Sequence, residues 1–193
     1  MGAAERLKEF VSEADYLRQE RLAEVKHEYF QGEVTAMSGA SLAQNIITAN
    51  LTAALLPRLR GRGCTTLGSD MRVHVPVLSL YTYPDVVVYC GKPRLVDDQF
   101  DTLLNPAMLV EVLSPGTRAY DLGEKGNRYR AIGTLQHYLL IDSLQPYAAL
   151  LTRAERPGQW LLTETSDPAA VLHLSAFDCE LPLIDVYEEV AFN

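Results

Sequence analysis

The strongest constraint on the fold is the segment Pro106–Tyr129, where an apolar run leads through a turn into a helical stretch. The apolar run begins with Ala107–Val110 and predicts a buried β-strand, yet it contains one acidic residue, Glu111. A turn at Ser114–Gly116 follows, and the helix after it presents Lys125. The chain must therefore fold around a strand that carries a carboxylate, with a lysine delivered from the next element.

Two acidic residues at apolar strands suggest a shared site. A buried carboxylate costs several kcal/mol unless it is paired, hydrogen-bonded or bound to a metal, so Glu111 either has such a partner or lies on the solvent face of its strand. Asp85 follows Pro84 and precedes the apolar run Val86–Tyr89, which places it at the rim of the sheet or makes it an ordinary strand-end aspartate. If the two strands are neighbours, the carboxylates converge, and a divalent cation such as Mg²⁺ would relieve their repulsion.

The helix expected over 121–132 supplies a cation to this region. Asp121 is expected at its N-cap, with Glu124 as the partner in an arrangement like a capping box. Asp121, Lys125 and Tyr129 are spaced i, i+4 and i+8 and therefore share one helix face. Lys125 can orient or help deprotonate an attacking water, or neutralise charge on a phosphate. The alternative is an ordinary surface lysine that pairs with Asp121.

Composition indicates a globular chain with an acidic surface. Its 193 residues, 48% of them apolar, suffice for one domain over 1–193 with a core over about 12–190. The net charge of −8 disfavours tight, non-specific binding of nucleic acid through lysine and arginine. Cys64, Cys90 and Cys179 lack CxxC spacing, which predicts free thiols in a reducing compartment. No secretion signal or membrane-spanning run is evident, so we expect a cytoplasmic protein without membrane contact.

Periodicity along the rest of the chain predicts an α+β fold, with a mixed central sheet of α/β type flanked by helices. Helices are expected over 12–23 and 42–60, and Gln31–Gly32 is expected to close a tight hairpin. His74 alternates with two valines and is expected at the surface, while residues 2–10 either lead into the first helix or belong to it. Strands are expected over 64–67, 71–75, 86–89 and 107–113, a C-terminal β-meander over 136–141, 147–152, 160–165 and 171–174, and a last short helix over 183–190.

The ordered motifs of the chain resemble the Uma-two family, a group of bacterial proteins placed among the PD-(D/E)xK restriction-endonuclease-like folds. The resemblance extends over about residues 12–190, and its specificity comes from the order and spacing of many short motifs. These motifs are Lys26–Tyr29, Met37–Ser41, Gly68–Val73, Tyr83–Val88, Val110–Pro115, Asp121–Lys125, Tyr129–Arg130 and Tyr138–Asp142.

The resemblance implies a divalent-metal-dependent DNA endonuclease. Asp85 and Glu111 would hold Mg²⁺, or alternatively Mn²⁺, and the backbone carbonyl of Val112 would be a third ligand. Glu28 would be an additional acid of the site, with Asp121, Gln44 and Tyr129 in auxiliary positions. The resemblance also implies a homodimer, because two active sites would cut the two strands of DNA.

Three positions depart from the patterns of this superfamily or family. Leu113 occupies the position where the general PD-(D/E)xK pattern has its lysine, and the resemblance implies that Lys125 takes over that role. Gln31 stands where the family often has an aspartate, and Gln44 aligns with a histidine that is common in the family. Two alternatives stay open: a non-catalytic binding or assembly module on the same fold, and a metal-dependent hydrolase of a smaller phosphoester.

Overall fold

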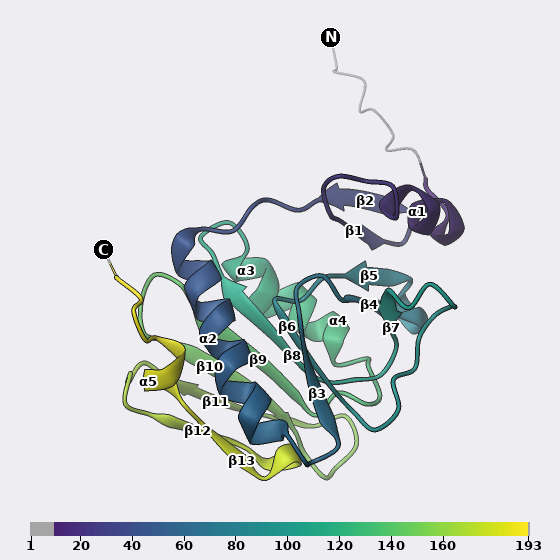
Figure 1. Ribbon diagram of the computed structural model, residues 1–193. Helices are drawn as coiled ribbons and strands as arrows, with labels where there is room; N and C mark the ends of the chain where they lie inside the picture. The colour runs from purple at the N-terminus through teal and green to yellow at the C-terminus, as the bar shows by residue number, and fades with distance from the viewer. Residues whose placement is uncertain (1–9, 193) are drawn as a thin grey trace.

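The computed structural model describes residues 10–192, and most of the predicted lead-in at 2–10 lies outside this range. Strand β8 (Pro106–Leu113) forms the middle of a six-stranded sheet, and all eight of its residues are buried because neighbouring strands and both covering layers enclose it (Figure 1). It pairs antiparallel with β6 and parallel with β9, so the sheet is mixed. The sheet runs in the order β11 (Trp160–Thr165), β10 (Ala148–Arg153), β9 (His137–Asp142), β8, β6 (Val86–Cys90) and β3 (Cys64–Gly68).

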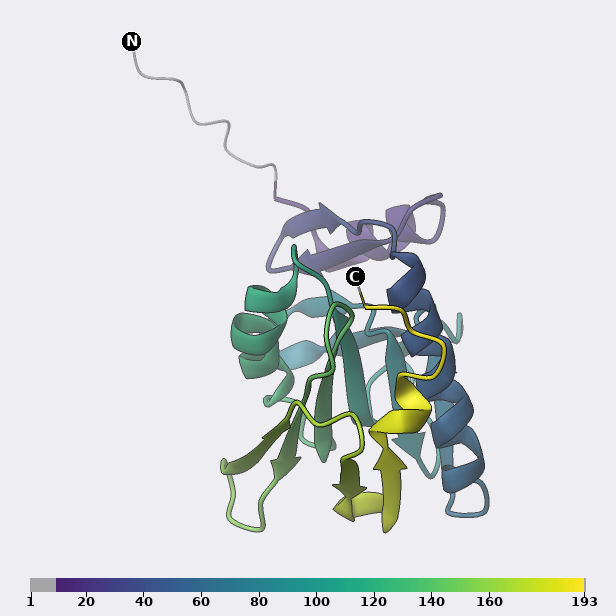
Figure 2. The same cartoon turned by 90° about the vertical axis from the view of Figure 1, so that its left-hand side faces the viewer.

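One face of this sheet is covered by the long helix α2 (Leu42–Leu59), as Figure 2 shows from the side. Ser41 caps the helix through a capping box with Gln44, and Pro57 lies in the last turn. The apolar side of α2 packs on alternate residues of β8 and β9. The same core also includes residues of β12 (Val171–Leu174), β13 (Cys179–Pro182), the turn η3 (Ser175–Phe177) and α5 (Leu183–Val186).

The other face is covered by a short helical segment and a second sheet. The helical segment consists of α3 (Arg118–Tyr120), a π-helical turn η2 (Asp121–Lys125) and α4 (Gly126–Tyr129). The second sheet has five strands in the order β2 (Glu33–Ala36), β1 (His27–Phe30), β5 (Leu80–Thr82), β4 (Arg72–Val75) and β7 (Thr102–Leu103). Helix α1 (Glu13–Glu20) packs against β1, and the turn η1 (Pro76–Leu78) joins β4 to β5.

Several predicted elements are present with shifted bounds. The two-residue loop Gln31–Gly32 joins β1 to β2, and both residues have positive φ, as a hairpin turn of this length requires. Helix α1 ends at Glu20, three residues earlier than predicted. The helix after β8 begins at Arg118 instead of Asp121, so the prediction that Asp121 is the N-cap was wrong. Asp121 lies buried within the helix because its side chain faces Lys125.

Two features of the sheets differ from the prediction. The second sheet was not predicted, because β5 and β7 contain only three and two residues and show no period of their own. The predicted meander holds for β9, β10 and β11, but β12 leaves the sheet and pairs with β13. Leu172 and Leu174 of β12 are buried in the core under α2, which a strand at the edge of the six-stranded sheet would not reach.

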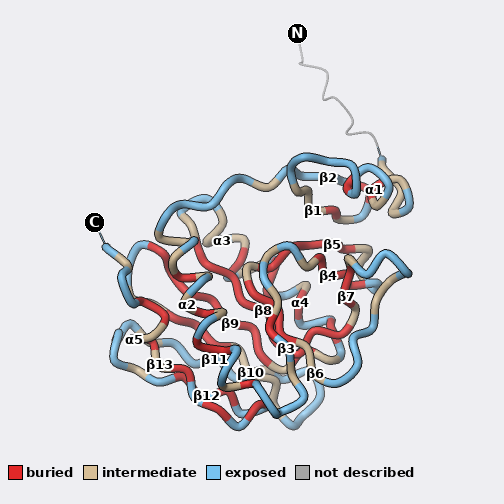
Figure 3. The backbone as a smooth tube through the Cα atoms, in the orientation of Figure 1, coloured by how far each residue is buried: buried red, intermediate tan, exposed pale blue. Residues whose placement is uncertain are grey.

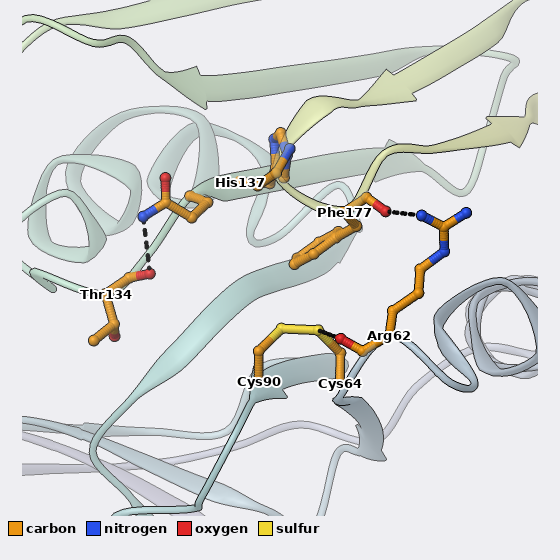
Figure 4. Close-up of a disulfide and its surroundings, with 8 residues drawn as sticks. Arg62, Cys64, Cys90, Thr134, His137 and Phe177 are labelled. Atoms are coloured by element: carbon orange, nitrogen blue, oxygen red, sulfur yellow. Dashed lines mark hydrogen bonds between the residues drawn. A yellow bond between two sulfur atoms is a disulfide. The ribbon is translucent and has the colours of Figure 1, made fainter.

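The prediction of three free cysteines was wrong. Cys64 of β3 and Cys90 of β6 are direct partners in an antiparallel pair, and they form a disulfide (Figure 4). The pairing places their Cα atoms 4.0 Å apart with both side chains on the same face of the sheet, so the two sulfur atoms meet. Cys179 is a free, buried thiol.

The prediction of a surface His74 was also wrong. His74 is buried because α1 covers its face of the second sheet: its Nε2 lies 3.4 Å from Oε2 of Glu13, and its ring stacks on Tyr81 with 3.9 Å between ring centroids. Over residues 10–192, no helix combines the length and the apolar character needed to cross a membrane.

Candidate active site

Alternation along β8 determines where its acidic residue points. Val110 and Val112 belong to the core under α2, whereas Leu109 and Leu113 belong to the core on the opposite face. Glu111 therefore faces the side that carries the helical segment α3–η2–α4. The residue is only 5% exposed, so the alternative of a solvent-facing acid on a half-exposed strand does not hold.

Lys125 reaches Glu111 from the last position of the π-helical turn. Its Nζ atom lies 2.9 Å from Oε1 of Glu111, 3.1 Å from Oε1 of Glu28 and 3.7 Å from Oδ1 of Asp121. The lysine is 6% exposed, which excludes the alternative of an ordinary surface lysine. Because β1, β8 and the helix each contribute a side chain, three separate parts of the chain meet at one ammonium group.

Two hydroxyl groups connect the acidic residues below Lys125. Tyr129 donates a hydrogen bond of 2.8 Å to Oε1 of Glu111. Thr82 of β5 donates to Glu28, and its hydroxyl lies 3.0 Å from that of Tyr129. Thr82 is fully buried and was missed by the sequence analysis, because a threonine in a three-residue strand carries no signal of such a contact.

Asp85 enters the site from the strand next to β8. Val86 pairs with Val110, so continuing the antiparallel register places Asp85 across from Glu111. The Asp85 carboxylate accepts a hydrogen bond of 2.7 Å from the backbone N–H of Val112. On the carbonyl side of the same residue, Nε2 of Gln44 donates to the Val112 oxygen at 3.2 Å. Gln44 therefore connects the start of α2 to the strand that carries Glu111.

These groups border one cavity of about 510 Å³. The hairpin β1–β2 forms one wall, and the helical segment with Tyr120 and Arg128 forms another. Tyr129 is buried beneath the cavity. The structure thus brings all the predicted side chains of the site to one place, while their roles stay predictions. Those that border the cavity are Glu28, Gln44, Asp85, Glu111, Asp121 and Lys125.

Burial shifts the ionisation of every acid in this cluster for which a shift is resolved. Burial raises the pKa of Asp85, and the hydrogen bond from Val112 opposes this shift only in part. Burial likewise raises the pKa of Asp121, against the attraction of Lys125. For Glu111, burial outweighs the attraction of Lys125 and raises the pKa to about 8. The acids are therefore held in an environment that disfavours their shared negative charge.

For Lys125 the neighbouring charges, and not burial, determine the direction of the pKa shift. Burial alone would lower the pKa of Lys125. The carboxylates of Glu111, Glu28 and Asp121 outweigh burial, and they hold the pKa well above its ordinary value. Lys125 is therefore an ammonium ion at neutral pH, with a proton that it does not readily release.

The donor set suits a hard divalent cation bound in part by water and substrate. Within residues 10–192, no three or more histidine, cysteine, aspartate or glutamate side chains are grouped as a metal site. Mg²⁺ is commonly held by only one or two carboxylates, with waters and phosphate oxygens completing its shell. Asp85, Glu111 and the Val112 carbonyl provide two carboxylates and a third oxygen. Five acidic side chains and two basic ones, Lys125 and Arg128, border the cavity, and a cation would offset the excess of acidic groups.

Comparisons with known proteins agree on a family and a fold. The model of the Uma2 (Uma-two) family, described as "Putative restriction endonuclease", matches residues 13–183. The chain is 35% identical over 164 residues to a Synechocystis protein named "Uncharacterized protein sll1609", covering 84% of this chain and 91% of that protein. It is 34% identical over 184 residues to a second Synechocystis protein, "Uncharacterized protein slr1290", covering 94% of each.

A solved structure from Anabaena variabilis has the same fold. It is described as "a putative nuclease belonging to DUF820", and it superposes with a TM-score of 0.76 at 16% identity, covering 94% of this chain and 99% of that one. At this identity the likeness shows the fold alone. It confirms the predicted class, a mixed α+β arrangement with helices on a central sheet. The restriction-endonuclease-like type of this fold agrees with the family match.

Proposed function

The chain belongs to the Uma2 family, and from this premise we propose that it is a divalent-metal-dependent DNA endonuclease that hydrolyses phosphodiester bonds. The observation that carries the proposal is the position of Lys125, whose ammonium lies 2.9 Å from Glu111 in a cavity that Asp85 also borders. An acid from each of two adjacent strands and a lysine from the next helix supply the groups that phosphodiester hydrolysis requires.

Each residue has a definite part in this proposal. Asp85, Glu111 and the carbonyl of Val112 would hold Mg²⁺, with Mn²⁺ as the alternative. The bound ion would act as a Lewis acid toward the phosphate and lower the pKa of a coordinated water. Lys125 keeps its proton, so its charge neutralises the developing negative charge on the phosphate and does not remove a proton from water. Tyr129 fixes the Glu111 carboxylate by its hydrogen bond.

The DNA substrate and the assembly belong to the same proposal. The family description supports nucleic acid as substrate, while the net charge of −8 favours contact that depends on the bound cation over contact through a basic surface. We propose one domain that acts as a homodimer, so that two sites cut the two strands. We also propose a cytoplasmic location. The Cys64–Cys90 disulfide would then lie in a reducing compartment, where such bonds are rare.

Nicking of supercoiled plasmid DNA tests the proposal. We expect cleavage with Mg²⁺ or Mn²⁺, none with EDTA, and loss of cleavage in both Glu111→Ala and Lys125→Ala. The matched controls Glu180→Ala and Lys92→Ala remove an exposed acid and an exposed lysine outside the cavity, and they should cleave normally. Calorimetry adds a second readout: Glu111→Ala should lose Mg²⁺ binding, whereas Lys125→Ala should keep it.

Three outcomes would contradict the proposal. Cleavage that survives both site substitutions would point to a contaminating nuclease. A protein that binds Mg²⁺ but cuts no DNA, and instead hydrolyses a small phosphodiester, would favour the alternative of a smaller substrate. A protein that does neither, under varied metals and substrates, would favour a non-catalytic module on the same fold.

A further inference from the structure

The helix that carries Lys125 is not a regular α-helix. Between α3 and α4 the chain is wound as a π-helical turn over Asp121–Lys125. Such a turn accommodates one residue more than an α-helix does, and it is frequent at functional sites. Because each residue of an α-helix turns the chain by about 100°, the extra residue sets the direction of Lys125 relative to α3.

A tyrosine on the neighbouring strand bonds the first residue of this turn. The hydroxyl of Tyr138 donates a buried hydrogen bond of 3.0 Å to the backbone carbonyl of Asp121. Tyr138 pairs with Leu109 of β8, so it lies on the face of the sheet that also presents Glu111. A π-helical turn displaces carbonyl groups from their α-helical partners, and a buried carbonyl requires a donor. The tyrosine therefore supplies a side-chain donor to a carbonyl at the start of the irregular turn.

A glycine at the end of the turn permits this contact. A Cβ atom on Gly126 would lie 3.1 Å from Cε1 of Tyr138 and 3.4 Å from the Asp121 carbonyl oxygen. The φ angle of Gly126 is −60°, an ordinary helical value, so the backbone conformation does not require glycine here. The requirement is space, because the helix approaches the tyrosine ring closely.

From these contacts we infer that Tyr138 and Gly126 are positioning residues that hold the π-helical turn and thereby direct Lys125 onto Glu111. Tyr138 does not border the cavity and acts only through the turn and its packing on Tyr129, with 5.1 Å between ring centroids. The inference rests on the proposed function for its effect on cleavage. It does not rest on it for the placement of Lys125, which can be measured separately.

The first test replaces the hydroxyl alone. Tyr138→Phe should lower kcat for plasmid nicking about tenfold to a hundredfold with KM unchanged, because small displacements of a catalytic group have effects of this size. Tyr187→Phe is the matched control: its buried hydroxyl also donates to a backbone carbonyl, at 2.8 Å to Tyr147, outside the cavity. An unchanged kcat in Tyr138→Phe, or an equal loss in both variants, would overturn the inference.

The second test needs no cleavage. Lys125→Met removes the partner of buried Glu111 and should lower the midpoint of chemical unfolding in the otherwise unchanged chain. The same substitution should lower the midpoint less when Tyr138→Phe is present. It should have almost no effect when Leu122, an exposed residue of the turn, is deleted and the helix becomes regular.

The two tests separate the inference from the proposed function. If the unchanged chain cuts nothing, the proposed function fails, and the unfolding cycle alone decides the inference. An equal effect of Lys125→Met in the unchanged chain and with Tyr138→Phe would show that Tyr138 does not direct Lys125. This comparison stands even if the deletion variant does not fold, because Tyr138→Phe removes only one atom from the protein.

Discussion

The two faces of strand β8 have different roles: one packs in an apolar core, and the other carries the candidate site. Toward α2 the strand presents Met108, Val110 and Val112, which pack with apolar side chains in an extended core. Toward the helical segment it presents Leu109, Glu111 and Leu113, and the acid is buried beside a lysine. Figure 3 shows that β8 and its neighbour β9 are buried along their length. The faces differ therefore in chemistry and not in exposure.

The two faces also differ in how burial affects stability. Burial of apolar side chains on the α2 face is favourable at about 25 cal/mol per Å². Burial of Glu111 and Lys125 removes two charges from water, and their attraction offsets this cost only with good geometry and further hydrogen bonds. Tyr129 supplies one such bond to Glu111. Substitutions on the two faces should consequently separate stability from activity.

The largest separation is expected for Glu111→Gln. The amide keeps an oxygen that can accept the bonds from Tyr129 and Lys125 but lacks the negative charge, so plasmid cleavage should fall about a hundredfold or more. Stability without metal should stay equal or rise, because one of several clustered acids is removed. Nicking rates and urea unfolding in EDTA measure the two effects. A parallel loss of stability and activity would show that Glu111 serves the fold instead of the site.

The sequence predicted the framework of this comparison because periodicity reports burial directly. The strand around Glu111 and the helix α2 follow from their apolar patterns, and the order of the motifs placed Asp85 at the start of another strand and Lys125 on the next helix. The structure shows that the two strands are neighbours. The π-helical turn was not predictable, since an i, i+4, i+8 spacing is the same whether the helix is regular or contains an extra residue. The contacts of Tyr138 and Thr82 depend on that turn and on a second sheet that has no sequence period.

Stability on the α2 face should respond more strongly than activity. Leu139→Ala empties a fully buried position in the core under α2 and should lower the free energy of unfolding by about 2–5 kcal/mol. The cleavage rate per folded molecule should not change. Leu140→Ala is the matched comparison, because Leu140 is also fully buried but pairs with Glu111. It should lower both quantities, and equal cleavage by the two variants would remove the functional distinction between the faces.

The disulfide shows a different limit of sequence reasoning. Both strands that carry Cys64 and Cys90 were predicted, but the order of strands in a sheet was not, and the pairing depends on that order. With three cysteines and no motif spacing, reduced thiols were the ordinary expectation. The error at His74 has a related cause, because its alternating pattern fits a surface position only if that face of β4 is open to solvent, and here α1 covers it.

The two faces should also have opposite pH dependence of stability in the absence of metal. On the α2 face, burial lowers the pKa of His137 to about 4, and its Nε2 accepts a hydrogen bond from the N–H of Ala176. The unfolded chain binds more protons there, so this stability is lost as pH falls from about 6.5 to 4. Glu111, with its pKa raised to about 8, does the reverse: its contribution is lost as pH rises from about 4.5 to 8.

Unfolding measured against pH in EDTA distinguishes these contributions. Each group should change the free energy of unfolding by at most about 1.4 kcal/mol per pH unit within its window. Glu111→Gln should flatten the decline on the alkaline side alone, and His137→Gln the decline on the acid side alone. A profile that either substitution leaves unchanged would show that the corresponding group keeps its ordinary pKa in the folded protein.

The smallest effect is expected at Gln44, where the helix on one face bonds the strand of the site. Its side-chain oxygen accepts from the N–H of Ser41 and completes the capping box, while its Nε2 donates to the Val112 carbonyl. Gln44→Ala loses both bonds and should lower the free energy of unfolding by about 1 kcal/mol. Gln44→Glu keeps the oxygen acceptor of the cap and loses only the donor to Val112.

The two variants therefore separate the contribution of Gln44 to capping α2 from its contribution to the site. Gln44→Glu should retain more stability than Gln44→Ala, because a glutamate at this position still caps α2. Both should slow plasmid cleavage by less than tenfold, since both lose the bond to Val112, which lies next to Glu111. Equal stabilities would show that the cap contributes nothing to the fold. Unchanged cleavage in both variants would show that the site does not need the hydrogen bond from α2 to the Val112 carbonyl. The site would then depend only on the sheet face that the helical segment α3–η2–α4 covers.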